Sequence, residues 1–81
     1  MDKLDIFFNA LRSLPFDDQA AFSYGHIRAD LFARGIPIGP NDMIIAAIAI
    51  SRNITLITHN ISEFSRVQGL DIEDWQNPRA S

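Results

Sequence analysis

The strongest constraint in this sequence is a run of eight apolar residues, Met43 to Ile50, that directly follows Ile38-Gly39-Pro40-Asn41-Asp42. A helix that is apolar on every side is a buried helix, so the chain has to enclose this segment. Asp42 lies in the first turn of the same helix, where the buried helix has to meet water. A carboxylate in that position can contribute to a metal or phosphate site if other polar residues lie nearby.

The length of the chain, 81 residues, allows one domain. A chain this short buries only about 60–65% of the surface that it exposes when unfolded, yet hydrophobic residues make up 47% of the sequence. A small body of this composition leaves apolar surface exposed, and exposed apolar patches usually mark interfaces. We therefore expect a homodimer, or a partner that completes the fold.

Charge, cysteine content and hydropathy exclude several classes of protein. The net charge of −3 argues against a basic nucleic-acid-binding surface, but not against an enzyme that holds phosphate through a bound metal ion. The absence of cysteine excludes a disulfide framework and a thiolate metal site. The acidic N-terminus lacks a signal-peptide pattern, and the longest apolar run is too short to span a bilayer. We expect no membrane partner and a cytoplasmic location.

Periodicity and capping signals predict the elements of the N-terminal half. Apolar residues at helical spacing predict an amphipathic helix from Leu4 to Leu11. The segment from Arg12 to Phe16 is typical of a short strand, with Pro15 suggesting a sheet edge. Asp17 is a suitable N-cap for a second helix, which Gly35 ends.

The C-terminal half combines one helix with two candidate strands. The third helix begins near Asn41 and ends at Arg52-Asn53, where asparagine can adopt the left-handed cap conformation. The β-branched, apolar segment Ile54 to Thr58 is typical of a buried parallel strand. A polar loop from His59 to Glu63 follows, and Leu70 to Glu73 alternates like a half-exposed strand. Residues Asn77 to Ser81 are expected to form a frayed tail.

Together these elements predict an α/β fold with three helices and two to three short, mostly parallel strands. A parallel strand that is buried on both faces needs neighbours, and sheets usually contain about five strands. Two or three short strands therefore resemble part of a sheet.

Polar residues follow the predicted buried strand at its carboxyl end, where open α/β sheets bind ligands. Asp42 begins the helix that precedes this strand, and a helix packs antiparallel to the strand that follows it. We therefore expect Asp42 to lie near Asn60 and Glu63. Carboxylate and amide oxygens are the ligands that Mg²⁺ and Mn²⁺ prefer, and such ions can promote cleavage of a phosphodiester.

Each of these residues also has a simpler interpretation. Asp42 can be present only because a negative charge stabilises the positive end of its helix. Asn60 can be present only because it favours a turn, and Glu63 can be an ordinary solvated acid on the surface. His26 is expected to have a structural role or to be exposed. A role of His59 as a metal ligand or as a base is a minor alternative. Pattern alone makes a metal-dependent site possible and leaves these alternatives open.

Several segments also carry a resemblance to a known family. They are Tyr24-Gly25-His26-Ile27-Arg28-Ala29-Asp30-Leu31, Gly35-Ile36-Pro37-Ile38-Gly39-Pro40-Asn41-Asp42-Met43-Ile44-Ile45-Ala46-Ala47, Leu56-Ile57-Thr58-His59-Asn60-Ile61-Ser62-Glu63-Phe64-Ser65-Arg66-Val67 and Gly69-Leu70-Asp71-Ile72-Glu73-Asp74-Trp75. In this order they resemble the C-terminal half of VapC-type PIN-domain toxins, from about Leu11 to Trp75.

The resemblance implies a fold, an activity and a set of site residues. VapC-type toxins are small cytoplasmic endoribonucleases of toxin–antitoxin pairs, are commonly dimeric, and cut RNA with Mg²⁺ or Mn²⁺ held by a cluster of acids. Asp42 matches the third acid of the family, Asn60 matches the position of the fourth, and Glu63 is near enough to assist. The resemblance therefore implies catalytic roles for all three, metal binding by Asp42 and Asn60, and an antitoxin and RNA as partners.

Two features of the family have no match in this sequence: the first strand, which ends in a metal-binding aspartate, and a glutamate on an early helix. We therefore expect residues 1–81 to form a single C-terminal PIN-like half domain that starts midway through the fold. It is expected to bind Mg²⁺ weakly and to be inactive alone, with RNA as a substrate only if a second chain completes the site. The alternatives are a non-catalytic module for dimerisation or antitoxin binding, and a truncated gene product without an evolved role.

Overall fold

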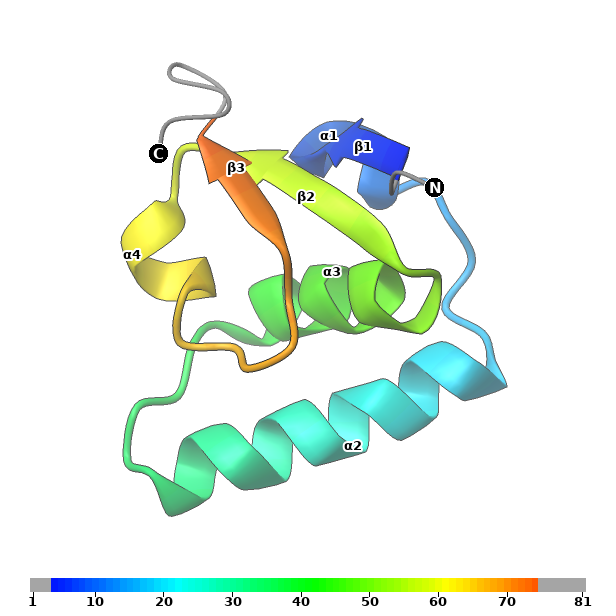
Figure 1. Ribbon diagram of the computed structural model, residues 1–81. Coiled ribbons are helices and arrows are strands. Elements are labelled where there is room, and N and C mark those ends of the chain that lie inside the picture. The colour runs from blue at the N-terminus through cyan, green and yellow to red at the C-terminus, as the bar shows by residue number, and fades with distance from the viewer. Residues whose placement is uncertain (1–3, 75–81) are drawn as a thin grey trace.

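The computed structural model describes residues 4–74 (Figure 1). Its elements are β1 (Leu4–Phe7), α1 (Phe8–Leu11), α2 (Asp18–Ala33), α3 (Pro40–Ser51), β2 (Ile54–Thr58), α4 (Ile61–Phe64) and β3 (Ile72–Asp74). The predicted α/β class is confirmed. The two long helices are α2 and α3, and the single turns α1 and α4 lie next to the strands.

The sheet, α3 and α2 form successive layers with α3 in the middle (Figure 1). One side of α3 packs on α2 and another on β2. Its buried residues are Met43, Ile45, Ala46, Ala47, Ile48 and Ala49. This enclosed position explains why α3 has no polar face. Among residues 4–74, no helix has the length and hydropathy needed to cross a bilayer.

Within the described residues the sheet has three strands in the order β1-β2-β3. Both pairings are parallel, with Leu4 opposite Ile54 and Thr58 opposite Asp74. The central strand β2 is almost entirely buried, as predicted for a parallel strand with a neighbour on each side. Because all three strands run in the same direction, their carboxyl ends lie along one edge of the sheet.

Local signals set the ends of the long helices as predicted. Asp17 caps α2, because its Oδ1 accepts a hydrogen bond from the backbone N–H of Ala20 at 3.0 Å. Gly35 has φ 70°, the left-handed conformation that ends many helices. Asn53 adopts φ 57° between α3 and β2, also as predicted.

The prediction of one helix from Leu4 to Leu11 is wrong. Only Phe8–Leu11 is helical, whereas Leu4–Phe7 pairs in parallel with β2. The backbone groups of β2 on this side need hydrogen-bonding partners, and the extended conformation of Leu4–Phe7 supplies them. Pairing with a distant strand therefore overrides the local helical periodicity.

The prediction of a strand from Arg12 to Phe16 is also wrong. The N–H groups of Ser13 and Leu14 donate to carbonyl groups three residues earlier, at 3.1 Å in each case, so the chain turns after α1. Pro15 has no N–H to donate to a sheet, which removes one bond that a strand here would need. The segment instead forms the connection from α1 to α2.

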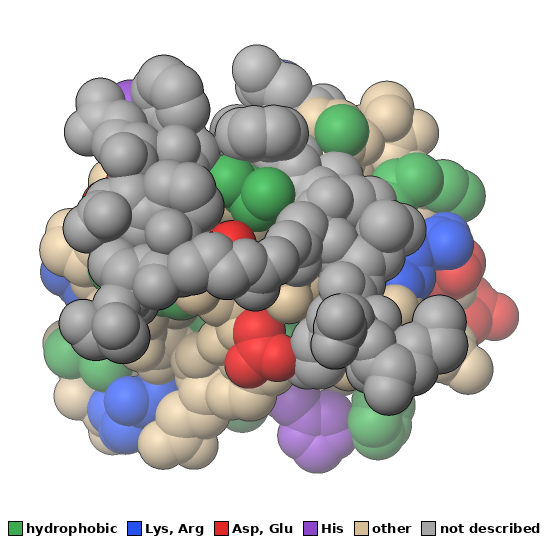
Figure 2. All heavy atoms as spheres, turned by 45° about the horizontal axis from the view of Figure 1, so that its top comes forward, with side chains coloured by type: hydrophobic (Ala, Val, Ile, Leu, Met, Phe, Trp, Pro, Cys, Tyr) green, Lys and Arg blue, Asp and Glu red, His purple; other side chains and the backbone are tan. Residues whose placement is uncertain are grey.

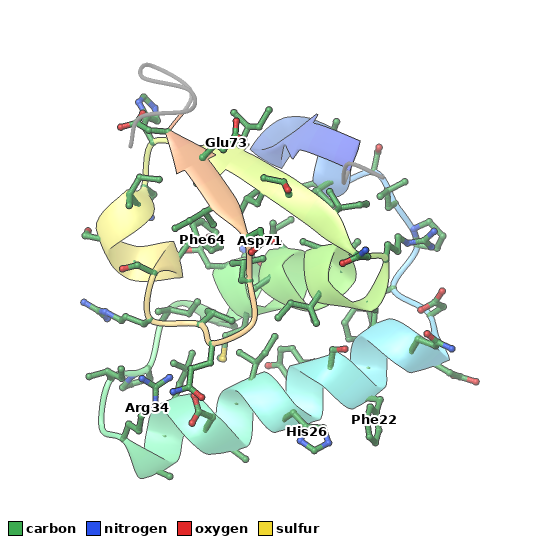
Figure 3. All side chains as sticks on the ribbon, in the orientation of Figure 1. Phe22, His26, Arg34, Phe64, Asp71 and Glu73 are labelled. Atoms are coloured by element: carbon green, nitrogen blue, oxygen red, sulfur yellow. The ribbon has the colours of Figure 1, made fainter. Side chains whose placement is uncertain are left out.

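The segment after β2 is more helical than predicted. The expected polar loop from His59 to Glu63 contains the start of α4, and the fully buried ring of Phe64 points from α4 into the interior (Figure 3). Burial of this ring requires the chain to coil back over the core. The last strand is Ile72–Asp74, so it begins two residues after the predicted start at Leu70, and its three residues are all half-buried rather than alternating in exposure. Trp75 and the expected tail, Asn77 to Ser81, lie outside the described residues.

Candidate functional site

The structure brings Asp42, Asn60 and Glu63 together beside the carboxyl end of β2. Asn60 Nδ2 donates to Glu63 Oε1 at 2.8 Å, and the backbone N–H of Gly39 donates to Glu63 Oε2 at 3.1 Å. Gly39 is the residue before α3, and a Cβ added to it would lie 3.8 Å from Asp42 Oδ2. The first turn of α3 and the residues after β2 therefore meet as expected from their antiparallel packing.

Asn60 is fixed by its neighbours on both sides. Thr58, the buried last residue of β2, accepts a hydrogen bond from the backbone N–H of Asn60 through its Oγ1 at 3.1 Å. Asn60 occupies the N-cap position of α4, but its side chain makes no capping bond. The amide donates to Glu63 instead. Shaping a turn alone does not account for this bond.

Asp42 is half-buried in the first turn of α3. Burial, the charge of Glu63 and a hydrogen bond with Glu63 raise the pKa of Asp42 above its ordinary value. A carboxylate that met only the positive end of a helix would have a lowered pKa. The pKa of Asp42 is raised first by burial and then by Glu63, and the position of Gly39 between the two side chains agrees with a carboxylate pair.

Glu63 is affected in the opposite direction. The hydrogen bond from the Gly39 N–H, followed by the bond from Asn60, holds the pKa of Glu63 below its ordinary value. The hydrogen bond with Asp42 and the charge of Arg66 also lower this pKa, while burial raises it. Of the two acids, Glu63 is the one stabilised in its charged form and Asp42 the one that retains a proton more readily.

This donor set fits a small divalent cation. Two carboxylates and an amide are oxygen ligands of the kind that Mg²⁺ and Mn²⁺ take, and a cation between the carboxylates would offset both the burial of Asp42 and its repulsion by Glu63. Both oxygens of Glu63 already accept hydrogen bonds, which favours Asp42 and Asn60 as ligands. Within residues 4–74, no group of three or more His, Cys, Asp or Glu is gathered for a metal ion.

Other candidates from the sequence do not extend this cluster. His26 is exposed on α2 and stacks edge-on against Phe22, with ring centroids 4.6 Å apart (Figure 3). His59 is exposed, and neither histidine completes a metal-binding group in the described part of the chain.

Sequence reasoning missed two contributors, the N–H of Gly39 and the guanidinium of Arg66. Arg66 lowers the pKa of Glu63 and donates to the Pro37 carbonyl at 3.1 Å, which ties the turn after α4 to the segment before α3. The i, i+3 spacing of Glu63 and Arg66 is a signal that could have found the arginine. The hydrogen bond from the Gly39 N–H to Glu63 joins residues 24 positions apart, so no local sequence pattern could have indicated it.

A cavity of about 380 Å³ adjoins Asp42, a size typical of ligand pockets. It lies between the connection after α1 and the first turns of α3. Its lining consists of Arg12, Leu14, Phe16, Asn41, Asp42, Ile44, Ile45 and Ile48. The candidate site therefore has an open space beside one of its carboxylates.

Charges of both signs are distributed over the surface. On the face shown in Figure 2, basic side chains occur in small separate groups, and acidic side chains lie between and beside them. This distribution agrees with the net charge of −3. On the described part of this face, basic side chains therefore form no continuous surface.

The chain is similar to proteins of known family. A family model described as "PIN domain" matches residues 2–70. The chain is 45% identical over 73 residues to ribonuclease VapC2 of Rickettsia felis, covering 90% of this chain and 54% of that protein. It is 46% identical over 69 residues to the tRNA(fMet)-specific endonuclease VapC of Salmonella typhimurium, covering 85% and 52%. The chain therefore spans about half the length of the curated relatives that it matches.

The fold is similar to that of a solved structure as well. VapBC-1 from nontypeable Haemophilus influenzae matches with a TM-score of 0.76 and 42% sequence identity, covering 79% of this chain and 48% of that chain. Sequence and fold therefore agree, and the resemblance predicted from the motifs is confirmed.

Proposed function

This chain belongs to the PIN-domain family, and we propose that it carries part of the site of a VapC-like, metal-dependent endoribonuclease. One observation carries the proposal: Glu63 accepts hydrogen bonds from Asn60 and from the N–H of Gly39, and Gly39 lies beside Asp42, so the three polar side chains meet at the end of β2. The relatives named as ribonucleases support RNA as the substrate class. The relative named for tRNA(fMet) makes transfer RNA the first substrate to test.

In the proposed mechanism Asp42 and Asn60 would hold Mg²⁺ or Mn²⁺, and Glu63 orients the amide of Asn60. A bound metal would supply stabilisation of phosphate charge and a more acidic water molecule. Asp42 has to release its proton before it can act as a ligand, so its raised pKa makes metal affinity fall as the solution becomes more acidic.

We further propose that the chain alone cleaves RNA weakly or not at all. Asp42 and Asn60, with Glu63 beside them, would supply only two of the ligands that Mg²⁺ requires and would bind it weakly. No third acidic or histidine side chain joins them in the described part of the chain. RNA becomes a substrate when another chain supplies further acids at this edge of the sheet.

Calorimetric titration with Mn²⁺ tests the site, and a cleavage assay on an initiator tRNA transcript tests the activity. We expect weak binding that disappears in Asp42→Asn and persists in the control Asp18→Asn, an acid in the first turn of α2. We expect Mg²⁺-dependent cleavage only after addition of a polypeptide carrying the family's first strand and acids, and its loss in Asp42→Ala. Equal Mn²⁺ binding by Asp42→Asn, or no cleavage after complementation, contradicts the proposal.

A second candidate function is binding without catalysis, to a copy of this chain or to an antitoxin, in the cytoplasm as for the family. Phe22 and Phe32 on α2 are 70% and 52% exposed. A second cavity of about 400 Å³ lies beside Phe22; its lining is Phe22, Ser23, His26, Ile27, Asp30, Ile50, Val67 and Gln68. The similarity to VapBC-5 from Mycobacterium tuberculosis, a member of the VapBC family of toxin-antitoxin systems, supports an antitoxin as partner.

A further inference from the structure

We propose that the cavity beside Asp42 holds one nucleotide of a bound RNA strand, with Arg12 contacting its phosphate and Phe16 stacking on its base. This inference rests on the proposed ribonuclease function, because it assigns the RNA contact next to the same carboxylate. It concerns binding, so it can be tested without cleavage.

Arg12 differs from the other arginines of residues 4–74. Arg34 pairs with Asp30, Arg52 pairs with Asp17, Arg66 donates to the Pro37 carbonyl, and Arg28 lies over the ring of Phe32 at 4.5 Å. Arg12 is exposed and, within the described part of the chain, has no hydrogen bond, ion pair or ring contact. It lines the cavity that Asp42 also lines, so its guanidinium is available to a ligand there.

Phe16 gives the same cavity an aromatic surface. Its side chain is 46% exposed, and it meets Tyr24 edge-to-face with ring centroids 6.0 Å apart. The contact with Tyr24 restrains the ring while leaving much of it open to solvent. Stacking of bases on exposed aromatic rings is a general mode of single-strand recognition. The remaining wall, formed by Leu14, Ile44, Ile45 and Ile48, is apolar and suits the flat faces of a base or ribose.

Charge complementarity favours RNA over a peptide in this cavity. A phosphodiester beside Asp42 would be repelled by the carboxylate unless a cation lies between them, which is the place of the proposed metal ion. The guanidinium of Arg12 is a second positive charge in the same cavity and can bind the phosphate directly. The net charge of −3 gives the whole molecule no general attraction for RNA, so the contact has to be local. The acidic side chain of a peptide would pair with the arginine but carries no ring to stack on Phe16, whereas a nucleotide supplies both the charge and the ring.

Fluorescence anisotropy with a short, labelled, single-stranded RNA of mixed sequence tests the proposal, first in EDTA and then in Mg²⁺. Arg12→Gln is expected to weaken binding about threefold or more and to reduce the slope of log K against log salt by about 0.7, the value for one phosphate contact on a single strand. Phe16→Leu is expected to weaken binding about fivefold or more through the lost stack.

Arg28→Gln and Phe32→Leu are the matched controls. They make the same two substitutions, of an arginine and of a phenylalanine, at exposed positions outside the cavity. Amide chemical shifts recorded during the RNA titration are expected to change at residues 12–16 and 41–48. The proposal is overturned if the RNA does not bind, if the control variants weaken binding as much as the cavity variants, or if shifts change only around Phe22 and His26. A labelled acidic peptide that binds more tightly than the RNA and depends on Arg12 also overturns it.

The same variants separate this proposal from the proposed function. Binding that depends on Arg12 and Phe16, without cleavage after complementation, supports the RNA contact and contradicts the nuclease. Cleavage that is unaffected by Arg12→Gln and Phe16→Leu supports the nuclease and contradicts this contact. Thermal denaturation of each variant establishes that it is folded.

Discussion

Asp42 and Glu63 belong to one carboxylate pair, yet their surroundings move their pKa values apart. Glu63 receives hydrogen bonds from Gly39 and Asn60, which stabilise its charge, whereas Asp42 is desolvated and faces that charge. Sequence reasoning placed Asp42, Asn60 and Glu63 near one another, because a helix and the strand that follows it pack antiparallel. It could not assign different environments to the two acids, since these depend on a backbone N–H distant in sequence.

At the residue scale we predict that Asp42→Asn stabilises the metal-free protein at neutral pH. Because the pKa of Asp42 is raised, the native state holds this proton more tightly than the unfolded state, and stability falls as the pH rises above the ordinary value of 3.8. Asparagine does not titrate and escapes this loss. Melting temperatures in EDTA are expected to be higher for the variant at neutral pH by a few degrees, with the advantage disappearing below pH 3.8.

Asp18→Asn is the control for this prediction, because Asp18 is exposed and lies on α2 rather than at the carboxylate pair. A destabilised Asp42→Asn variant at neutral pH would contradict the interpretation of Asp42 as a desolvated member of the pair.

At the element scale, the ends of α2 and α3 follow from local backbone chemistry. Asp17 supplies an acceptor to an N–H that has no partner within α2, Gly35 takes a left-handed conformation without steric cost, and Asn53 tolerates the same conformation. These ends were predicted correctly because each depends on residues close in sequence. The N-terminal segment was predicted incorrectly because Leu4–Phe7 can form either a helical turn or a strand, and its pairing with β2 decides between them.

We predict that Asp17→Ala lowers the free energy of unfolding by about 1 kcal/mol, through loss of the N-cap of α2. Asp18→Ala, one residue later, removes an exposed acid of the first turn without removing the cap, and is expected to cost about 0.3 kcal/mol. Urea denaturation of both variants measures the difference. Equal losses of unfolding free energy in the two variants would show that negative charge at the helix end, rather than the capping hydrogen bond, stabilises α2. The Arg52–Asp17 ion pair at 3.5 Å is exposed and contributes little to this difference.

At the scale of the whole molecule, the sheet covers one side of α3 and α2 covers the other (Figure 1). This arrangement buries the apolar helix but leaves Phe16, Phe22 and Phe32 exposed. The expectation that a short apolar chain leaves part of its hydrophobic surface open is therefore correct for these rings. Their assignment to a partner remains a prediction.

We predict that the chain associates through the cavity beside Phe22, and that Phe22→Ser raises the dissociation constant of the dimer about tenfold or more. Phe32→Ser is the control, because this ring is also exposed on α2 but does not line the cavity. Sedimentation velocity over a range of concentrations measures the effect. A stable monomer at all concentrations, or equal effects of the two variants, would exclude a specific interface at this cavity.

The sequence by itself determined that Met43 to Ile50 is buried and that Ile54 to Thr58 is an interior parallel strand. It also determined that Asp42 lies near the residues that follow this strand. These properties depend on apolar patterning and on backbone preferences that act within a few residues. Only the tertiary structure decided that Leu4–Phe7 pairs with β2, that Gly39 holds Glu63 in its charged form, and that Arg12 shares a cavity with Asp42. Each of these joins segments far apart in the chain, where hydrogen bonding and burial, rather than local preference, select the conformation.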